Sequence, residues 1–265
     1  YTSAEKGFDE MSLRKSPPVA WVVLNRPHRL NAITPKMIDE LEMCLREVDG
    51  DGSIRVVGIR GEGDKAFSAG ADISSYEFSS PSKVFDASRR WFEVFSLVER
   101  LSKPVVAAIN GYAFGGGCEL ALACDFRLAS KSSQIGLTET NLGLMPGAGG
   151  TQKLVRVVGL SNAKRMIFFG ERVPAEEALR IGLVDAVFSN EEFDSKVDEF
   201  VAKLAKRAPI ALKFAKRALN LAFQVPTDLG QLFEASGFSL LVTTQDVSEG
   251  ISAFLSKREP EFKGE

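Results

Sequence analysis

Two glutamates beside glycine-rich segments are the side chains of this chain with the clearest chemical potential. Glu119 lies in "YAFGGGCELALACDF" (112–126), where three consecutive glycines precede an apolar, helix-forming run. Glu139 lies in "IGLTETNLGLMPGAGG" (135–150), a polar stretch that ends in a second glycine-rich turn. Taken singly, Glu119 would only complement a helix dipole and Glu139 would be a surface carboxylate. Taken together, they are candidates for an acid/base pair.

The glycines before Glu119 supply a second kind of chemistry. Glycines allow the backbone to approach a ligand closely, and the N–H groups at a helix N-terminus favour negative charge. The segment "GDKAFSAGADI" (63–73) is another glycine loop that follows an apolar strand. If the two strands are neighbours, both loops emerge at one end of the sheet. One N–H from each loop would then form an oxyanion hole, in which each donor contributes about 3–4 kcal/mol in the transition state.

Other common chemistries lack their residues. The single histidine, His28, lies in an arginine-flanked loop, and no G-x-S-x-G motif accompanies it, so we expect a solvated side chain. Cys44, Cys118 and Cys124 lack metal-ligand spacing, so no metal site is expected, and Cys118 and Cys124 are expected to be small buried apolar residues. The strict dinucleotide fingerprint and the P-loop pattern are also absent.

Alternating strands and helices would position these segments. Apolar runs predict strands within 19–24, 53–63, 103–109, 126–130 and 182–188, and helical spacing predicts helices after Thr34, over 81–102 and over 151–159. From Asp194 onward the pattern is helical only. The prediction is an α/β core over 1–193 and a C-terminal helical region over 194–265, which together form one functional unit.

The composition is that of an ordinary globular protein. The 265 residues carry a formal charge of −2, and 45% of them are apolar. This near-neutral balance indicates no nucleic-acid partner, and no apolar run reaches the ~18 residues of a membrane helix. An odd number of cysteines favours a reducing compartment. We expect a cytoplasmic protein, or one of the mitochondrial matrix if a targeting segment has been removed.

An ordered set of motifs resembles one known family. The motifs are "LNRPHRLNAI", "AFSAGADI", "PVVAAINGYAFGGGCELALACDFRLAS", "LTETNLGLMPGAGGTQKLVRVVG" and "EGISAFLSKREPEF". From about Val19 to Phe262, the chain resembles the enoyl-CoA hydratase/isomerase (crotonase) family. The resemblance implies a spiral of ββα turns, a C-terminal helical part used for trimerisation, often as a dimer of trimers, and an acyl-CoA thioester ligand. Coenzyme A is then part of the substrate, and no separate cofactor is expected.

The resemblance also assigns roles to residues. It implies that the N–H groups of Ala71 and Gly116 hold the thioester oxygen, and that Gly147 helps to hold the water or hydroxyl group. Glu119 and Glu139 occupy the positions of the two hydratase carboxylates. The residues that would line the coenzyme A groove are Arg26, Leu30, Ala69, Gly70, Asp72 and Ile73. Candidates to bind its phosphates, from a neighbouring subunit, are Lys257, Arg258 and Lys263. These three residues could equally well be solvated charges at the end of a helix.

The presence of both carboxylates favours one activity within the family. Relatives that only shift double bonds often keep one carboxylate and have an apolar residue at the other position. The prediction is therefore reversible hydration of short-chain trans-2-enoyl-CoA to 3-hydroxyacyl-CoA. Glu119 would deprotonate water and Glu139 would protonate Cα. Two nearby carboxylates cannot both ionise freely, so one pKa should be raised.

Three alternatives remain open from the sequence. The first is another enzyme of this fold, such as an isomerase, hydrolase or decarboxylase. The second is a non-catalytic or RNA-binding relative, against which the near-neutral charge argues. The third is the hydratase part of a bifunctional enzyme fused to a 3-hydroxyacyl-CoA dehydrogenase, because the chain begins at Tyr1 rather than Met. Acyl-chain length also stays open, with Tyr76, Phe78 and Phe114 as candidates for the acyl pocket or for packing.

Overall fold

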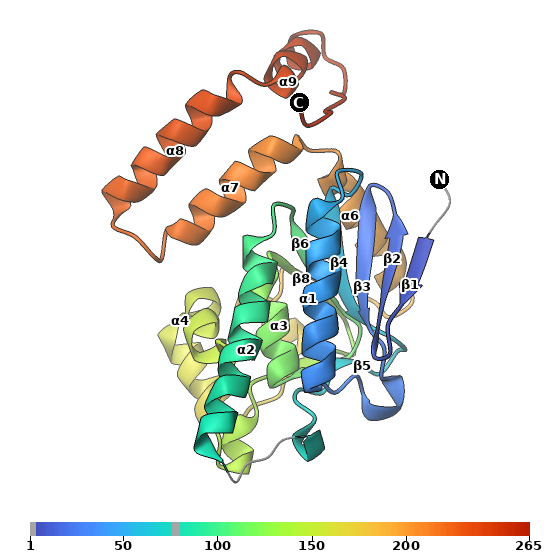
Figure 1. Ribbon diagram of the computed structural model, residues 1–265, viewed down its shortest axis with the longest axis vertical. Helices are drawn as coiled ribbons and strands as arrows, with labels where there is room; N and C mark the ends of the chain where they lie inside the picture. The colour runs from blue at the N-terminus through green and yellow to red at the C-terminus, as the bar shows by residue number, and fades with distance from the viewer. Residues whose placement is uncertain (1–3, 76–79) are drawn as a thin grey trace.

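Strands and helices alternate through most of the chain in the computed structural model, which describes residues 4–75 and 80–265 (Figure 1). The strands are β1 (Ala4–Gly7), β2 (Met11–Ser16), β3 (Val19–Leu24), β4 (Val56–Gly61), β5 (Ala66–Ser68), β6 (Val105–Ile109), β7 (Tyr112–Phe114), β8 (Phe126–Ser130), β9 (Gln134–Gly136), β10 (Val173–Pro174) and β11 (Ala186–Phe188). The helices are α1 (Pro35–Gly50), α2 (Pro81–Arg100), α3 (Gly116–Ala123), α4 (Gly150–Phe168), α5 (Ala175–Arg180), α6 (Phe193–Ala205), α7 (Pro209–Leu221), α8 (Thr227–Leu241) and α9 (Gln245–Leu255). Short 3₁₀ turns are η1 (Pro27–Arg29), η2 (Ile73–Ser75) and η3 (Glu139–Leu142).

The strands form two sheets, and the chain visits them in turn. The seven-stranded sheet has the order β1-β2-β3-β4-β6-β8-β11, and the four-stranded sheet has the order β10-β9-β7-β5. Each of the pairs β4–β5, β6–β7 and β8–β9 places one strand in the large sheet and the next in the small sheet, and a helix follows. Neighbouring strands from β3 to β11 in the large sheet run parallel. This arrangement is the ββα spiral expected from the sequence.

The large sheet is covered by helices on both faces. Val57 and Ile59 belong to the core shared with α1, α2 and α3, while Val56 belongs to a second core shared with α6. Side chains alternate between the faces of a strand, so a strand covered on both sides becomes continuously apolar. This explains the uninterrupted "VVAAI" of β6, every residue of which is buried.

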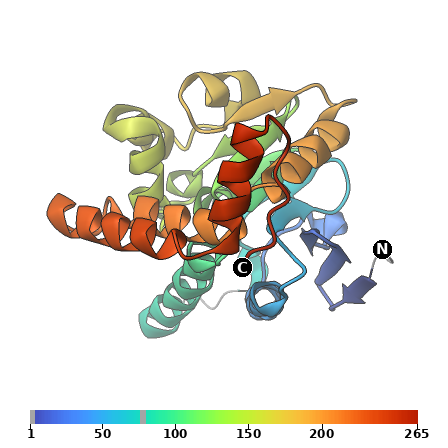
Figure 2. The ribbon, with the colours of Figure 1, turned by 90° about the horizontal axis from the view of Figure 1, so that it is seen from above.

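The last three helices extend from one end of this body (Figures 1 and 2). α7 is attached to it by Lys216, whose Nζ donates to Val98 O and Lys103 O at 3.0 Å each and to Asp125 Oδ2 at 2.7 Å. Within residues 4–75 and 80–265, no helix is long and apolar enough to cross a membrane.

The expected elements and the observed ones differ mainly at short strands. β3 and α1 begin where predicted, with Thr34 Oγ1 accepting the hydrogen bond from Met37 N. β5, β7 and β9 have three residues each and lie where loops were expected. Three residues are too few to show a period of two, so pairing partners rather than local pattern specify them. The strand predicted over 182–188 is shortened to β11, because Gly182 has a φ of +76° and belongs to the turn after α5.

Gly111 fixes the distance between two of these strands and is a test of the fold. A Cβ at this position would lie 2.2 Å from Lys65 O, in the backbone that leads into β5. We expect Gly111→Ala to lower the free energy of unfolding by about 1–3 kcal/mol through overpacking. Urea denaturation measures the loss. The matched control is Gly52→Ala, which has no atom within 4 Å of the added carbon. Equal losses of stability in the two variants would contradict the close packing of Gly111 against Lys65 O.

Candidate active site

The two glycine loops meet at a cavity of about 200 Å³. β4 and β6 are parallel neighbours, with Val57 opposite Val105, so both loops emerge at the same end of the sheet, as the sequence predicted. The loops are in contact, since a Cβ on Gly70 would lie 2.8 Å from Phe114 O and 3.5 Å from Gly116 N. The site residues predicted from sequence that line this cavity are Ala69, Gly70, Ala71, Ile73, Gly116, Glu119, Glu139 and Gly147.

A turn at Gly115 directs α3 into the cavity wall. Gly115 has a φ of +49° and a ψ of −124°, a backbone conformation that residues other than glycine rarely adopt. Its N–H donates to Gly136 O at 2.9 Å, and its carbonyl accepts from Glu119 N at 2.9 Å. The next residue must also be small, because a Cβ on Gly116 would lie 2.6 Å from the Trp91 ring.

Two backbone N–H groups at the cavity are free to bind a ligand. Ile33 N donates to Gly70 O, and Asp72 N donates to Ile33 O, which forms a parallel bridge between Ile33 and Ala71. In such a bridge the N–H of Ala71 itself points away from Ile33. Across residues 4–75 and 80–265, neither Ala71 N nor Gly116 N donates a hydrogen bond.

Glu119 is buried with specific hydrogen-bond donors. Its side chain projects from the first turn of α3, and the residue is 3% exposed. Oε1 accepts from Ala148 N and Gly150 N at 2.8 Å each, where α4 begins. Burial raises the pKa of Glu119, and the hydrogen bonds from Gly150 and Ala148 and the charge of Lys153 oppose that rise.

Glu139 faces the same cavity with fewer partners. It begins η3, which is attached to the second half of α4 because Thr140 Oγ1 donates to Ile167 O at 2.7 Å. Glu139 Oε2 is buried and has no hydrogen-bond partner among the residues that the structure describes. Burial and the negative charge of Glu119 raise the pKa of Glu139 to about 7. The expected raised carboxyl pKa is therefore found at Glu139.

Several predicted groove residues lie outside the cavity. Arg26 Nη1 pairs with Asp72 Oδ2 at 3.0 Å, and neither lines the cavity. Leu30 lines a separate hollow of about 210 Å³ beside Asn31. Asn31 is buried and joins the 26–31 segment to β5, accepting from Arg26 N and donating to Ala66 O.

The candidate phosphate ligands lie on the segment after α9. Arg258 forms a bidentate pair with Glu249, at 2.6 and 2.7 Å. Lys257 and Lys263 are exposed on the same segment, away from the cavity.

Three aromatic residues were candidates for the acyl pocket. Phe114 is 7% exposed and stacks on Tyr112, with ring centroids 5.3 Å apart, so its side chain serves packing. Tyr76 and Phe78 lie outside the described residues. His28 is exposed and the cysteines are buried, as expected.

The sequence did not reveal every residue of the site. It pointed to Gly147 but not to Ala148 and Gly150, whose N–H groups bind Glu119. A helix start after "PGAGG" was a usable signal, because the first N–H groups of a helix lack intrahelical partners. The apolar rim of the cavity is formed by Leu142, Leu144 and Met145. No sequence pattern indicated these residues, because the segment that carries them has no regular strand or helix period.

Comparisons with known proteins show which family the chain belongs to. The family model described as enoyl-CoA hydratase/isomerase matches residues 14–265. The short-chain-enoyl-CoA hydratase of Clostridium acetobutylicum is 39% identical over 96% of this chain and 97% of its own length. The crotonyl-CoA hydratase of Syntrophomonas wolfei is 38% identical over 96% of this chain and 98% of its own length. The crystal structure of an enoyl-CoA hydratase from Bacillus anthracis superposes with a TM-score of 0.93 at 40% identity, covering 97% of this chain and all of that one.

The fold and the cavity thus define an enzyme of the crotonase fold. The chain belongs to the enoyl-CoA hydratase/isomerase family, which confirms the family predicted from its motifs.

The interaction between the two carboxylates can be measured directly. In the ligand-free protein we expect Glu139 to titrate at about 7 rather than at its ordinary 4.5. Glu119→Gln removes a negative charge that raises the pKa of Glu139, so the titration should move to lower pH. Carbon-13 NMR of labelled glutamate side chains measures the pKa of Glu139 in the wild type and in the variant. Glu93→Gln, an exposed carboxylate of α2, is the control and should leave this pKa unchanged. A wild-type Glu139 that titrates at its ordinary value would show that neither burial nor Glu119 raises its pKa.

Proposed function

We propose that this protein catalyses the reversible addition of water to trans-2-enoyl-CoA, giving 3-hydroxyacyl-CoA. The observation that carries the proposal is the convergence of Glu119, Glu139 and two unpaired N–H groups on one cavity. The activities for which the Clostridium and Syntrophomonas relatives are named support the same reaction.

The N–H groups of Ala71 and Gly116 stabilise the charge that develops on the thioester oxygen. When water adds to Cβ, the electrons of the double bond move toward the carbonyl and form an enolate. Both donors are placed before the substrate arrives, so they cost no reorganisation during the reaction. This group is the oxyanion hole of the proposed mechanism.

The two glutamates divide the proton transfers. Glu119 receives two backbone hydrogen bonds, which favour its ionised form, and it takes a proton from the attacking water. Glu139, with a pKa of about 7, keeps a protonated fraction at neutral pH and delivers a proton to Cα. Gly147 lines the cavity next to Ala148 and helps to hold the water.

The cavity suits a short, uncharged acyl chain. It is small, and Ile73, Leu142 and Met145 form part of its apolar lining. Its lining residues, within the part of the chain that the structure describes, include no lysine or arginine that could bind a terminal carboxylate. Coenzyme A would follow the 69–73 loop, and Lys257, Arg258 and Lys263 of a neighbouring subunit would meet its phosphates. Because coenzyme A is part of the substrate, this reaction needs no cofactor.

The C-terminal helices are proposed to assemble the protein into trimers. Large apolar side chains are more than half exposed along α7, α8 and α9; they include Leu219, Phe223, Leu232, Phe238, Ile251, Phe254 and Leu255. Isolated monomers rarely expose so much apolar surface on one region. The dimer of trimers expected from the family resemblance would be built from such units.

Replacing either glutamate should abolish most of the hydration. With crotonyl-CoA, Glu119→Gln and Glu139→Gln should each lower kcat by about 10²–10⁴-fold, the usual contribution of a positioned acid or base. The loss of enoyl-thioester absorbance follows the reaction, and a series of longer enoyl-CoAs measures the acyl preference.

Two comparisons make this test specific. Glu93→Gln should hydrate like the wild type, and thermal melts should show that all variants fold. Full activity in both glutamate variants would rule out the mechanism. Retained double-bond isomerisation in Glu119→Gln would instead reveal an isomerase activity that needs only Glu139.

The oligomeric state provides a separate test. Light scattering should give the mass of three or six chains. Phe238→Asp and Phe254→Asp, at side chains 72% and 82% exposed, should dissociate the assembly because they introduce charge into its apolar contacts. Lys203→Asp, on the exposed surface of α6, should leave the mass unchanged. A wild-type monomer at all concentrations would contradict the proposal.

A further inference from the structure

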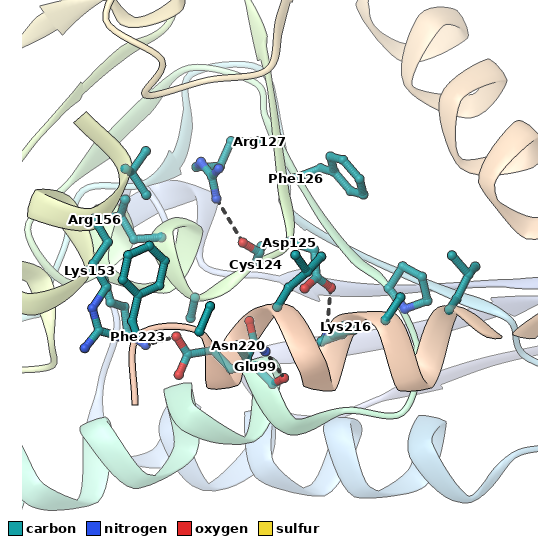
Figure 3. A pocket seen from close by; sticks show the side chains of 18 of the residues that line it. Glu99, Cys124, Asp125, Phe126, Arg127, Lys153, Arg156, Lys216, Asn220 and Phe223 are labelled. Carbon is teal, nitrogen blue, oxygen red and sulfur yellow. Dashed lines mark hydrogen bonds and ion pairs between the residues drawn. The ribbon is translucent and has the colours of Figure 1, made fainter. Parts of the chain in front are cut away.

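A partly buried ion pair involves the first turn of α4, the helix whose start binds Glu119. Lys153, in the first turn of α4, pairs through Nζ with Glu99 Oε1 near the end of α2. The lysine side chain is 8% exposed and the glutamate side chain is 32% exposed. Both residues line a pocket of about 700 Å³ between α7 and the body (Figure 3).

Lys153 and Glu119 contact adjacent residues of one turn. A Cβ on Gly149 would lie 3.0 Å from Lys153 Cε, and a Cβ on Gly150 would lie 2.9 Å from Glu119 Oε1. The Lys153 side chain thus lies against the turn that binds Glu119. Burial raises the pKa of Glu119, and the charge of Lys153 opposes that rise together with the stronger effect of the hydrogen bonds from Gly150 and Ala148. No cation of the described chain acts in this way on Glu139, where only burial and Glu119 raise the pKa.

The other charged groups around the pocket are engaged elsewhere. Asp125 pairs with Lys216 of α7 at 2.7 Å (Figure 3). Arg127 donates to Cys124 O and Leu183 O, and Arg156 lies over the Phe223 ring at 5.5 Å.

Two carboxylates of α2 also have cationic partners. α3 carries no charged side chain except Glu119. On α2, Glu93 pairs with Arg89, and Glu99 pairs with Lys153. Within residues 4–75 and 80–265, Lys153 is therefore the cation that acts on Glu119.

We propose that the Lys153–Glu99 pair is a positioning device that helps to keep the proton on Glu139 rather than on Glu119. The inference rests on the proposed hydratase function. Lys153 stabilises the ionised form of Glu119, and the retained negative charge of Glu119 in turn favours the protonated form of Glu139. Glu99 keeps the ammonium group in place and reduces its effect, so that Glu119 remains basic enough to accept a proton from water.

The pair also connects the active site to the C-terminal helices. Asn220 Nδ2 donates to Glu99 O at 3.0 Å, and Lys216 Nζ donates to Val98 O at 3.0 Å. The attachment of α7 therefore holds the end of α2, and with it the carboxylate that pairs with Lys153.

Opposite charge changes in the pair should move the pH dependence in opposite directions. Lys153→Met removes the cation, so the pKa of Glu119 should rise. The acidic limb of kcat/KM should then move to higher pH by about half a unit to one unit, the effect of one nearby charge in a partly shielded medium. Glu99→Gln removes the anion that reduces the effect of Lys153, so the limb should move to lower pH. Lys153→Arg, which keeps the charge, should restore the wild-type limb.

A second readout does not depend on catalysis. Carbon-13 NMR titration of the ligand-free protein should show the same opposite shifts at Glu119. Lys103→Met is the control, because it also removes a buried lysine, one whose Nζ donates to Asp51 O and not to any residue of the pair; it should lower stability without moving the titration. Glu99→Gln changes a partly exposed side chain, so it tests the inference even if Lys153→Met does not fold.

The outcomes separate the inference from the proposed function. If the pair serves stability alone, Lys153→Met and Glu99→Gln lower kcat or the melting temperature while the limb and the titration stay in place, and the inference is overturned. If Glu119→Gln and Glu139→Gln hydrate like the wild type, the hydratase mechanism fails, and a shifted titration would still show that the pair controls the protonation of Glu119.

Discussion

The burial of the Glu119 carboxylate is the constraint on which the rest of the site depends. An ionised group that is 3% exposed loses its hydration and must find donors within the protein. Ala148 and Gly150 supply them, but only if the turn that opens α4 lies directly against α3. That approach requires glycine at position 150, where a Cβ would lie 2.9 Å from Glu119 Oε1. The layered order of α2, α3 and α4 follows from this need.

The same arrangement separates the properties of two chemically identical side chains. Glu119 has backbone donors and a nearby cation, whereas Glu139 Oε2 is buried without a partner in the described structure. A neutral carboxyl tolerates that environment better than an anion. The fold thus gives two residues of the same type different surroundings, as the proposed division into a base and an acid requires.

Part of the fold and of the site could be predicted from the sequence, and the rest could not, for physical reasons. The strand–glycine–helix pattern around Glu119 and the repeated loop around Gly70 indicated that the two loops meet at one sheet end if their strands are neighbours, and the pairing of β4 with β6 meets that condition. The pairing of Asn31 with Ala66 and the cation at Lys153 were not predictable, since both depend on contacts between segments distant in the sequence. The three-residue strands were not predicted for the same reason, because only their pairing with other strands defines them. The expected coenzyme A residues Arg26 and Asp72 pair with each other outside the cavity.

The triple glycine before Glu119 has a consequence for how such an enzyme could change its substrate. These positions are crowded rather than flexible: a Cβ would meet Glu139 at position 115, the Trp91 ring at 116 and Ser68 at 117. Each neighbour is itself part of the wall or its support, so no single replacement there can be absorbed locally. The segment bearing Leu142, Leu144 and Met145 is exposed and packs more loosely. If the proposed function holds, adaptation to new acyl groups would therefore proceed through that rim, while the glycine segment proposed to bind the thioester stays fixed by steric exclusion.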